Sequence, residues 1–256
     1  MEDALILREE RSLLVSHANT TSMLSADAYR LVYPYQRLDL SKQKTMTEIV
    51  ESILEIKDEI ENYSVYDSFD AVLFALRYIQ ENHIENCADK KFVDCFGFCG
   101  ASAFYAAAFG FGTVLGIEFT KCGLNKAEQI QAGLFQKLQS YCALSFEFGS
   151  FQDLLPYDGH VLFLDCTIMS IDSMLDEGVL LHSIFFPMCR KLQSGTFLVI
   201  LTSTVTLHTE DCKKFDVPFE CVSHKGVIPN NANHEADFGD KFPKTVWILK
   251  TWRPFK

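Results

Sequence analysis

The sequence predicts an α/β fold, in which a seven-strand and mostly parallel sheet follows an N-terminal helical segment. From Lys91 onward, short apolar runs alternate with longer segments of helical periodicity, which is typical of a parallel sheet wrapped by crossover helices. After Leu201 the helical repeat stops, and two further apolar runs fit a pair of strands. A hydrophobic content of 48%, with 22 Phe, is enough for a packed core. We therefore expect one sheet-containing domain with a helical segment before it.

Residues 1–85 form the predicted helical segment. Its beginning has mixed spacing, and Pro34 interrupts any regular element there. Thr45–Tyr63 carries isoleucines at spacings of three and four residues, which predicts an amphipathic helix. Asp67–Ile84 has the same period and starts with Asp and Ser, either of which can cap a helix. A second helix is expected there, and the sheet-containing domain then covers residues 86–256.

The sheet-containing domain divides into strands and helices in a regular order. The predicted strands are Phe92–Cys95, Thr113–Glu118, Leu144–Phe148, Val161–Asp165 and Thr196–Leu201, and the predicted helices between them are Ala101–Phe109, Asn125–Cys142 and Asp172–Lys191. The terminal strand pair falls within Thr204–Val227 and Lys244–Trp252, joined through a turn-rich stretch. Five strands with helices followed by a strand pair are the Rossmann-like arrangement of the class I methyltransferases.

Cysteine content and charge limit the classes of protein that fit. The nine cysteines are an odd number without a CxxC pair, which argues against a zinc site and against a disulfide framework. No apolar run approaches about 18 residues and no cleavable leader is evident, so we expect a soluble intracellular protein that does not enter a membrane. The net charge of −11 disfavours direct nucleic-acid binding without a local basic patch, and no Lys and Arg run supplies one.

The turn after the first strand has the spacing of a nucleotide site. Asp94, Gly97 and Gly100 occupy this turn, which begins "DCFGFCGAS", and Glu118 ends the second strand 24 residues after Asp94. Glycine lets the backbone approach a ligand closely, and an acid at that second strand end can accept hydrogen bonds from ribose hydroxyls. Dinucleotide and methyl-donor sites share this spacing. The turn lacks the GxGxxG of nicotinamide sites, and the chain lacks the P-loop, GxSxG and HExxH motifs.

Six blocks of the chain have a familiar order: "YDSFDAVLFALRYI", "KFVDCFGFCGASAF", "TVLGIEFTKCGLNKAEQI", "FEFGSF", "VLFLDC" and "LQSGTFLVILTS". In this order they resemble the disruptor-of-telomeric-silencing family of histone-lysine methyltransferases. The resemblance covers roughly Tyr66 to Trp252. It implies a seven-strand methyltransferase domain over residues 86–256, S-adenosylmethionine as cofactor, a histone or nucleosome as protein substrate, and a nuclear location. The sequence shows no basic import signal, so a cytoplasmic location stays open.

The resemblance also implies roles for individual residues. The cofactor would be bound by Asp94, by the turn residues Phe96, Gly97, Gly100 and Ala101, by Glu118 at the ribose, and by Ser150 and Phe151 at the adenine. Asp165 would border both the cofactor and the channel for methyl transfer, and Trp247 would line the lysine pocket, which makes these two the expected catalytic residues.

Some residues depart from the pattern of that family. Phe96 and Phe98 stand where the first turn has glycines, "SVYD" stands where a glutamate would reach the cofactor, and Ser150 replaces an acid. Two alternatives therefore stay open beside protein-lysine methylation. One is a degenerate methyltransferase fold that acts as a binding or scaffold protein. The other is methylation of RNA or of a small molecule.

Overall fold

The computed structural model describes residues 65–95, 100–138, 142–154, 158–166, 192–202, 219–227 and 244–251. The predicted helices Thr45–Tyr63 and Asp172–Lys191 lie outside these residues, as do Phe96, Gly97 and Phe98. The described elements are α4 (Val65–Asn82), β1 (Lys91–Asp94), α5 (Ala101–Phe109), β2 (Thr113–Glu118), α6 (Lys121–Leu138), β3 (Ala143–Phe148), α7 (Phe151–Leu154), β4 (Val161–Asp165), β5 (Phe197–Thr202), β6 (Phe219–Val227) and β7 (Lys244–Thr251).

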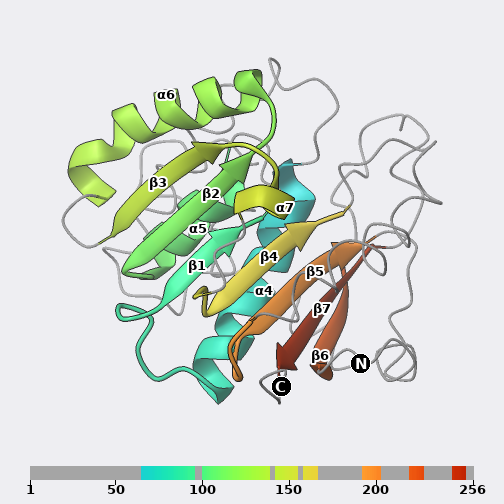
Figure 1. Cartoon of the computed structure of the whole chain (residues 1–256). Helices are drawn as coiled ribbons and strands as arrows, with labels where there is room; N and C mark the ends of the chain where they lie inside the picture. The colour runs from blue at the N-terminus through green and yellow to red at the C-terminus, as the bar shows by residue number, and fades with distance from the viewer. Residues whose placement is uncertain are drawn as a thin grey trace, which may run out of the picture.

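The seven strands form one mixed sheet, which confirms the predicted fold class (Figure 1). Their spatial order is β3-β2-β1-β4-β5-β7-β6. Strands β1 to β5 run parallel to one another, whereas β7 runs antiparallel to both β5 and β6. The strand order reverses at β1, so β1 and β4 mark the switch point where open α/β sheets bind ligands at the carboxyl ends of the strands.

Three of the described helices differ from the sequence-based prediction. Helix α4 begins at Val65 and ends at Asn82, two residues before the predicted bounds at each end, so Asp67 and Ser68 lie within the helix. Helix α6 begins at Lys121, whereas the apolar pattern predicted a start at Asn125. The Thr120 hydroxyl accepts a hydrogen bond from the Gly123 N–H at 3.0 Å, which caps the helix directly after β2. Helix α7 was not predicted, because four residues are too few to show a helical period.

The two faces of the sheet carry separate hydrophobic clusters. On one face, α4 and α5 pack over residues such as Phe92, Val114 and Phe163. All nine residues of α5 are buried, in keeping with a helix that is apolar on every side. The other face holds Leu115, Leu164 and their neighbours. None of the described helices is long and apolar enough to cross a membrane.

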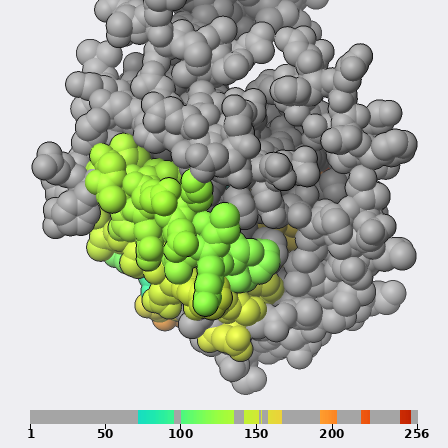
Figure 2. Space-filling model, turned by 90° about the horizontal axis from the view of Figure 1, so that it is seen from above, coloured from blue at the N-terminus to red at the C-terminus, as the bar shows by residue number. Residues whose placement is uncertain are grey.

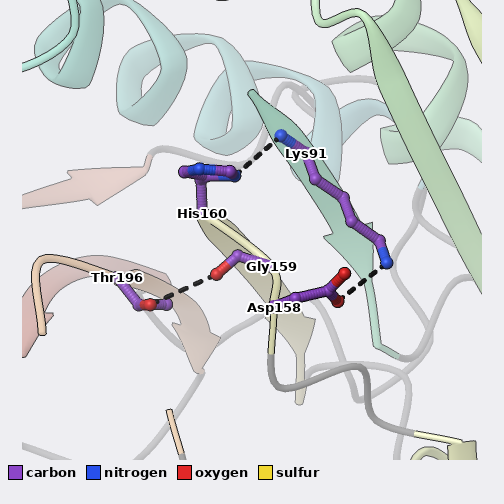
Figure 3. Close-up of polar contacts among 5 residues, drawn as sticks. All are labelled: Lys91, Asp158, Gly159, His160 and Thr196. Carbon is purple, nitrogen blue, oxygen red and sulfur yellow. Dashed lines mark hydrogen bonds and ion pairs between the residues drawn. The ribbon is translucent and has the colours of Figure 1, made fainter. Parts of the chain in front are cut away.

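Polar contacts tie β1, β4 and β5 together at their amino ends (Figure 3). The Lys91 N–H donates to His160 Nδ1 at 3.0 Å, and Lys91 Nζ lies 2.9 Å from Asp158 Oδ1. The Thr196 hydroxyl donates to the Gly159 carbonyl at 3.2 Å. The polar groups of this edge are thus used to join the strands, and the candidate site lies at the opposite, carboxyl edge.

Candidate functional site

Three buried acids end three neighbouring parallel strands: Asp94 on β1, Glu118 on β2 and Asp165 on β4. Asp94 is paired with Gly116 and Phe163, so Glu118 and Asp165 lie two residues further along on either side of it. Because side chains alternate with a period of two, all three acids project from the same face of the sheet. This is the face that α4 and α5 cover. The structure therefore brings these three predicted residues to one edge and one face.

Asp94 is held by the helix that follows it. The Ser102 hydroxyl, in the first turn of α5, donates a hydrogen bond to Asp94 Oδ2, and both side chains are buried. A charge-assisted bond of this kind fixes the orientation of the carboxylate. Sequence reasoning missed Ser102, although its place shortly after the first-turn glycines was a usable signal.

Gly100 caps α5 in a conformation that favours glycine. Its φ is 73°, and a Cβ at this position would lie 2.3 Å from Cε1 of Phe146. The same ring covers Gly116, where a Cβ would lie 2.4 Å from Cδ1 of Phe146. Ala101, the first residue of α5, is buried behind Gly100. Glycine at these two positions lets the β3 side chain pass between β2 and the start of α5.

Glu118 has two oxygens in different surroundings. Its Oε1 accepts hydrogen bonds from the Thr120 N–H at 2.7 Å and from the Thr120 hydroxyl at 2.8 Å. Its Oε2 is buried and has no hydrogen-bond partner among the described residues. Burial raises the pKa of Glu118, while the hydrogen bonds from Thr120 and Phe119 act in the opposite direction. An unused acceptor in this position suits a ligand hydroxyl.

The turn after β3 lies beside Glu118. The Gly149 N–H donates to the Glu118 carbonyl at 2.9 Å, and Ser150 follows at the start of α7, where its carbonyl accepts from the Asp153 N–H at 3.0 Å. Ser150 therefore follows a turn that lies beside the end of β2, next to Glu118. Phe151 is buried at 4% exposure in the cluster on the opposite face of the sheet. In this structure its ring packs in the core.

Trp247 is separated from Asp165 by the sheet itself. Asp165 is paired with Leu201, and Leu201 with Val246, whereas Trp247 is paired with Ile200. Trp247 and Ile200 belong to the cluster on the face opposite Asp165. The structure thus does not bring the two expected catalytic residues together. Trp247 stacks instead on His224 of β6, with ring centroids 4.9 Å apart.

Two exposed phenylalanines flank Glu118. Phe148 is paired with Glu118 across β2 and β3 and is 50% exposed, and Phe119, the residue after Glu118, is 46% exposed. Figure 2 views the molecule from above, where α6 in green and the yellow segments that follow it in the chain lie at the surface. Sequence reasoning did not select these aromatic residues, because apolar residues at strand ends usually join the core.

Across the described residues, no group of three or more His, Cys, Asp and Glu side chains could hold a metal ion. When ionised, the carboxylates at the carboxyl edge are hydrogen-bond acceptors.

The strand order and the antiparallel position of β7 define the seven-strand, Rossmann-like class I methyltransferase fold. No family model matches the chain, and no curated protein matches it in sequence. Among solved structures, a protein of Pyrococcus horikoshii provisionally described as an RNA methyltransferase is similar in fold, with a TM-score of 0.51 and 12% identity over 72% of this chain and 85% of that one. The finer resemblance to histone-lysine enzymes stays a prediction.

Two further solved structures are more distant. A geranyl diphosphate methyltransferase in complex with S-adenosylmethionine has a TM-score of 0.49 and 11% identity, over 75% of this chain and 92% of that one. A methylase of Haemophilus influenzae, also described provisionally, has a TM-score of 0.46 and 14% identity, over 71% of this chain and 88% of that one.

Proposed function

We propose that the protein is an S-adenosylmethionine-dependent methyltransferase. The observation that carries the proposal is the buried Glu118 carboxylate, which ends β2 with one oxygen unused among the described residues. It lies at the carboxyl edge of a class I methyltransferase fold, where the ligands of such sheets bind. A buried polar atom without a partner is costly, so a ligand hydroxyl at Oε2 would remove that cost.

The residues present fit the cofactor. Glu118 Oε2 would accept from the ribose, and Asp94, held by Ser102, would accept from the methionine amino group. Gly100 has a φ of 73°, which favours glycine, and this turn would bring the start of α5 close to the ligand. Ser150 lies next to Glu118 along the edge and can donate or accept a hydrogen bond at the adenine.

The sulfonium of the bound cofactor supplies a methyl group that is already activated. The chain's own residues then have to orient the cofactor, exclude water and place the acceptor in line. Asp165, buried at the end of β4, can accept hydrogen bonds from an acceptor amine or hydroxyl and so orient it. Trp247 lies on the opposite face of the sheet, so we assign it no role in this step.

RNA and small molecules are the favoured candidates for the methyl acceptor. The solved structure of similar fold is described as an RNA methyltransferase, which supports this class. The net charge of −11 disfavours a long contact with a phosphate backbone, so a small molecule or a short single-stranded RNA fits best. The exposed Phe119 and Phe148 offer aromatic surface at the same edge.

A histone-type lysine is the second candidate acceptor. Asp165 stands where the resembling family has an asparagine, and a carboxylate there could hold a cationic amine electrostatically. A histone or nucleosome partner and a nuclear location belong to this candidate only.

Calorimetric titration with S-adenosylmethionine and S-adenosylhomocysteine tests the function. We expect saturable binding by the wild-type chain and a loss of affinity of at least tenfold in Glu118→Ala. Transfer of labelled methyl groups to short RNA, to a panel of small molecules and to nucleosomes then ranks the acceptors. An absence of binding at millimolar ligand would contradict the proposal and would leave the degenerate binding or scaffold protein as the better interpretation.

A further inference from the structure

The two oxygens of the Glu118 carboxylate offer different numbers of open acceptor positions. An ionised carboxylate has about four such positions, two on each oxygen. Both positions on Oε1 are used, because the N–H and the hydroxyl of Thr120 donate to it at 2.7 and 2.8 Å, and the Phe119 N–H also donates to the carboxylate. Oε2 is buried and has no partner among the described residues. Of the two oxygens, only Oε2 therefore has acceptor positions left for a ligand hydroxyl.

The start of α6 holds this arrangement in place. A Cβ on Gly123 would lie 2.6 Å from Cδ of Glu118 and 2.7 Å from Oε2, so the helix passes close to one side of the carboxylate and a larger residue there would push against it. The Gly123 N–H donates to the Thr120 hydroxyl at 3.0 Å. The same hydroxyl thus caps α6 and donates to Glu118, which ties the carboxylate orientation to the helix.

We propose that Thr120 and Gly123 are positioning residues that leave Glu118 a single open oxygen, so that Glu118 binds only one of the two ribose hydroxyls of an adenosyl ligand. A carboxylate with both oxygens open could take the vicinal 2′ and 3′ hydroxyls, one on each oxygen. Here Thr120 already occupies one of those oxygens, and Gly123 closes one side of the other. The inference rests on the proposed function, because it assumes that an adenosyl compound binds at this edge.

Calorimetric titration of the wild-type chain with S-adenosylhomocysteine and with its 2′-deoxy and 3′-deoxy analogues tests the inference. We expect one analogue to bind about tenfold or more weakly, as for a lost hydrogen bond to a charged group, and the other to bind within about twofold of the parent. Equal losses for both analogues, or no loss for either, would overturn the single-hydroxyl inference. A lack of binding by the parent compound would instead overturn the proposed function, and the inference with it.

Variants of the chain show whether Glu118 and Thr120 cause the selectivity. In Glu118→Ala the sensitive analogue should bind as the parent does, because the acceptor is gone; a difference that persists in this variant would contradict the inference. Thr120→Val removes the hydroxyl and opens one position on Oε1, so the tolerated analogue should now bind severalfold more weakly than the parent. Thr120→Ser keeps the hydroxyl and is the matched control, with the wild-type selectivity expected. Thermal unfolding of each variant reports separately on the loss of the α6 cap.

Discussion

At the scale of single residues, the acids of the candidate site differ in how they are satisfied. Asp94 receives a hydrogen bond from Ser102 of α5, whereas Glu118 is satisfied at Oε1 by its near neighbour Thr120. The residues that orient the acids are a serine and a threonine. Both are common residue types, and their presence in a sequence does not by itself indicate a site. Their importance comes from the buried carboxylates that they contact.

Removal of the Ser102 hydroxyl should weaken both stability and ligand binding. We expect Ser102→Ala to lower the free energy of unfolding by roughly 1.5–3 kcal/mol, since a hydrogen bond to a buried charged group is lost. The affinity for S-adenosylhomocysteine should fall as well, because Asp94 loses its fixed orientation. Denaturant unfolding and calorimetry measure the two effects. Ser145→Ala, at an exposed position of β3, is the control and should leave both unchanged.

The raised pKa of Glu118 makes its contribution to stability depend on pH. A carboxyl group whose folded pKa lies above its unfolded value binds its proton more tightly in the native state. Its contribution is therefore fully present below the unfolded pKa of about 4.5 and is lost as pH rises through the folded value. In the absence of ligand, Glu118→Gln should gain stability over wild type at pH 7.5, and the gain should vanish toward pH 4.5. Denaturant unfolding at both pH values is the measurement, and a gain that grows toward acid pH would contradict the assignment.

At the scale of elements, the contact of β2, β3 and α5 depends on one ring and two glycines. Phe146 of β3 lies over Gly116 of β2 and against Gly100 at the start of α5, and it also packs on Phe104 at a centroid distance of 5.2 Å. The ring therefore sets how closely α5 approaches the strand that ends in Glu118.

Gly116→Ala should destabilise the protein, because its Cβ would lie 2.4 Å from the Phe146 ring. We expect a loss of about 1–3 kcal/mol, as for overpacking in a core, and partial recovery in the double variant with Phe146→Leu. Gly133→Ala is the matched control, since a Cβ there would meet nothing within 4 Å and alanine favours the helix by up to about 1 kcal/mol. Chemical denaturation of these variants and of Phe146→Leu alone provides the comparison, and additive losses in the double variant would argue against the contact.

At the scale of the whole molecule, the polar residues at the amino ends of the strands differ in role from those at the carboxyl ends. At the amino edge, His160, Lys91 and Asp158 join β1 to β4, and at the carboxyl edge three buried acids form the candidate site. Burial, with the nearby Lys90 and Lys91, lowers the pKa of His160, and Asp158 and Asp89 act in the opposite direction. The neutral imidazole can then accept the Lys91 N–H at Nδ1.

His160 at the amino edge should therefore make the free energy of unfolding depend on pH without affecting ligand affinity. A histidine with a lowered folded pKa stabilises the native state above its unfolded pKa of about 6.5, and this contribution is lost as pH falls through the folded value. His160→Asn keeps an acceptor without the titration, so its unfolding free energy should fall less steeply than that of wild type between pH 7.5 and 5.5. Affinity for S-adenosylhomocysteine at pH 7.5 should stay unchanged, because the substitution lies at the far end of the strands. A large loss of affinity would show that the two edges are coupled.

Much of the fold followed from local pattern. The strands Thr113–Glu118 and Val161–Asp165 and the helix Ala101–Phe109 were predicted with the bounds that the structure has, because each is a short apolar run between turn residues. The start of α6 was predicted four residues too far along the chain. Thr120 caps the helix almost directly after β2, so no polar stretch separates strand from helix in the sequence. The domain boundary after residue 85 and the substrate class stay predictions.

The sequence by itself determined the α/β class and placed Asp94, Glu118 and Asp165 at strand ends, because apolar runs and the residues that end them are local features. Only the tertiary structure decided which of the predicted residues share a site. A shift of one residue in the pairing of β5 with β7 decides the face of Trp247, and the approach of α6 decides which Glu118 oxygen stays open. The first depends on pairing between distant segments, and the second on the conformation of the turn between β2 and α6, and neither is encoded in the apolar pattern.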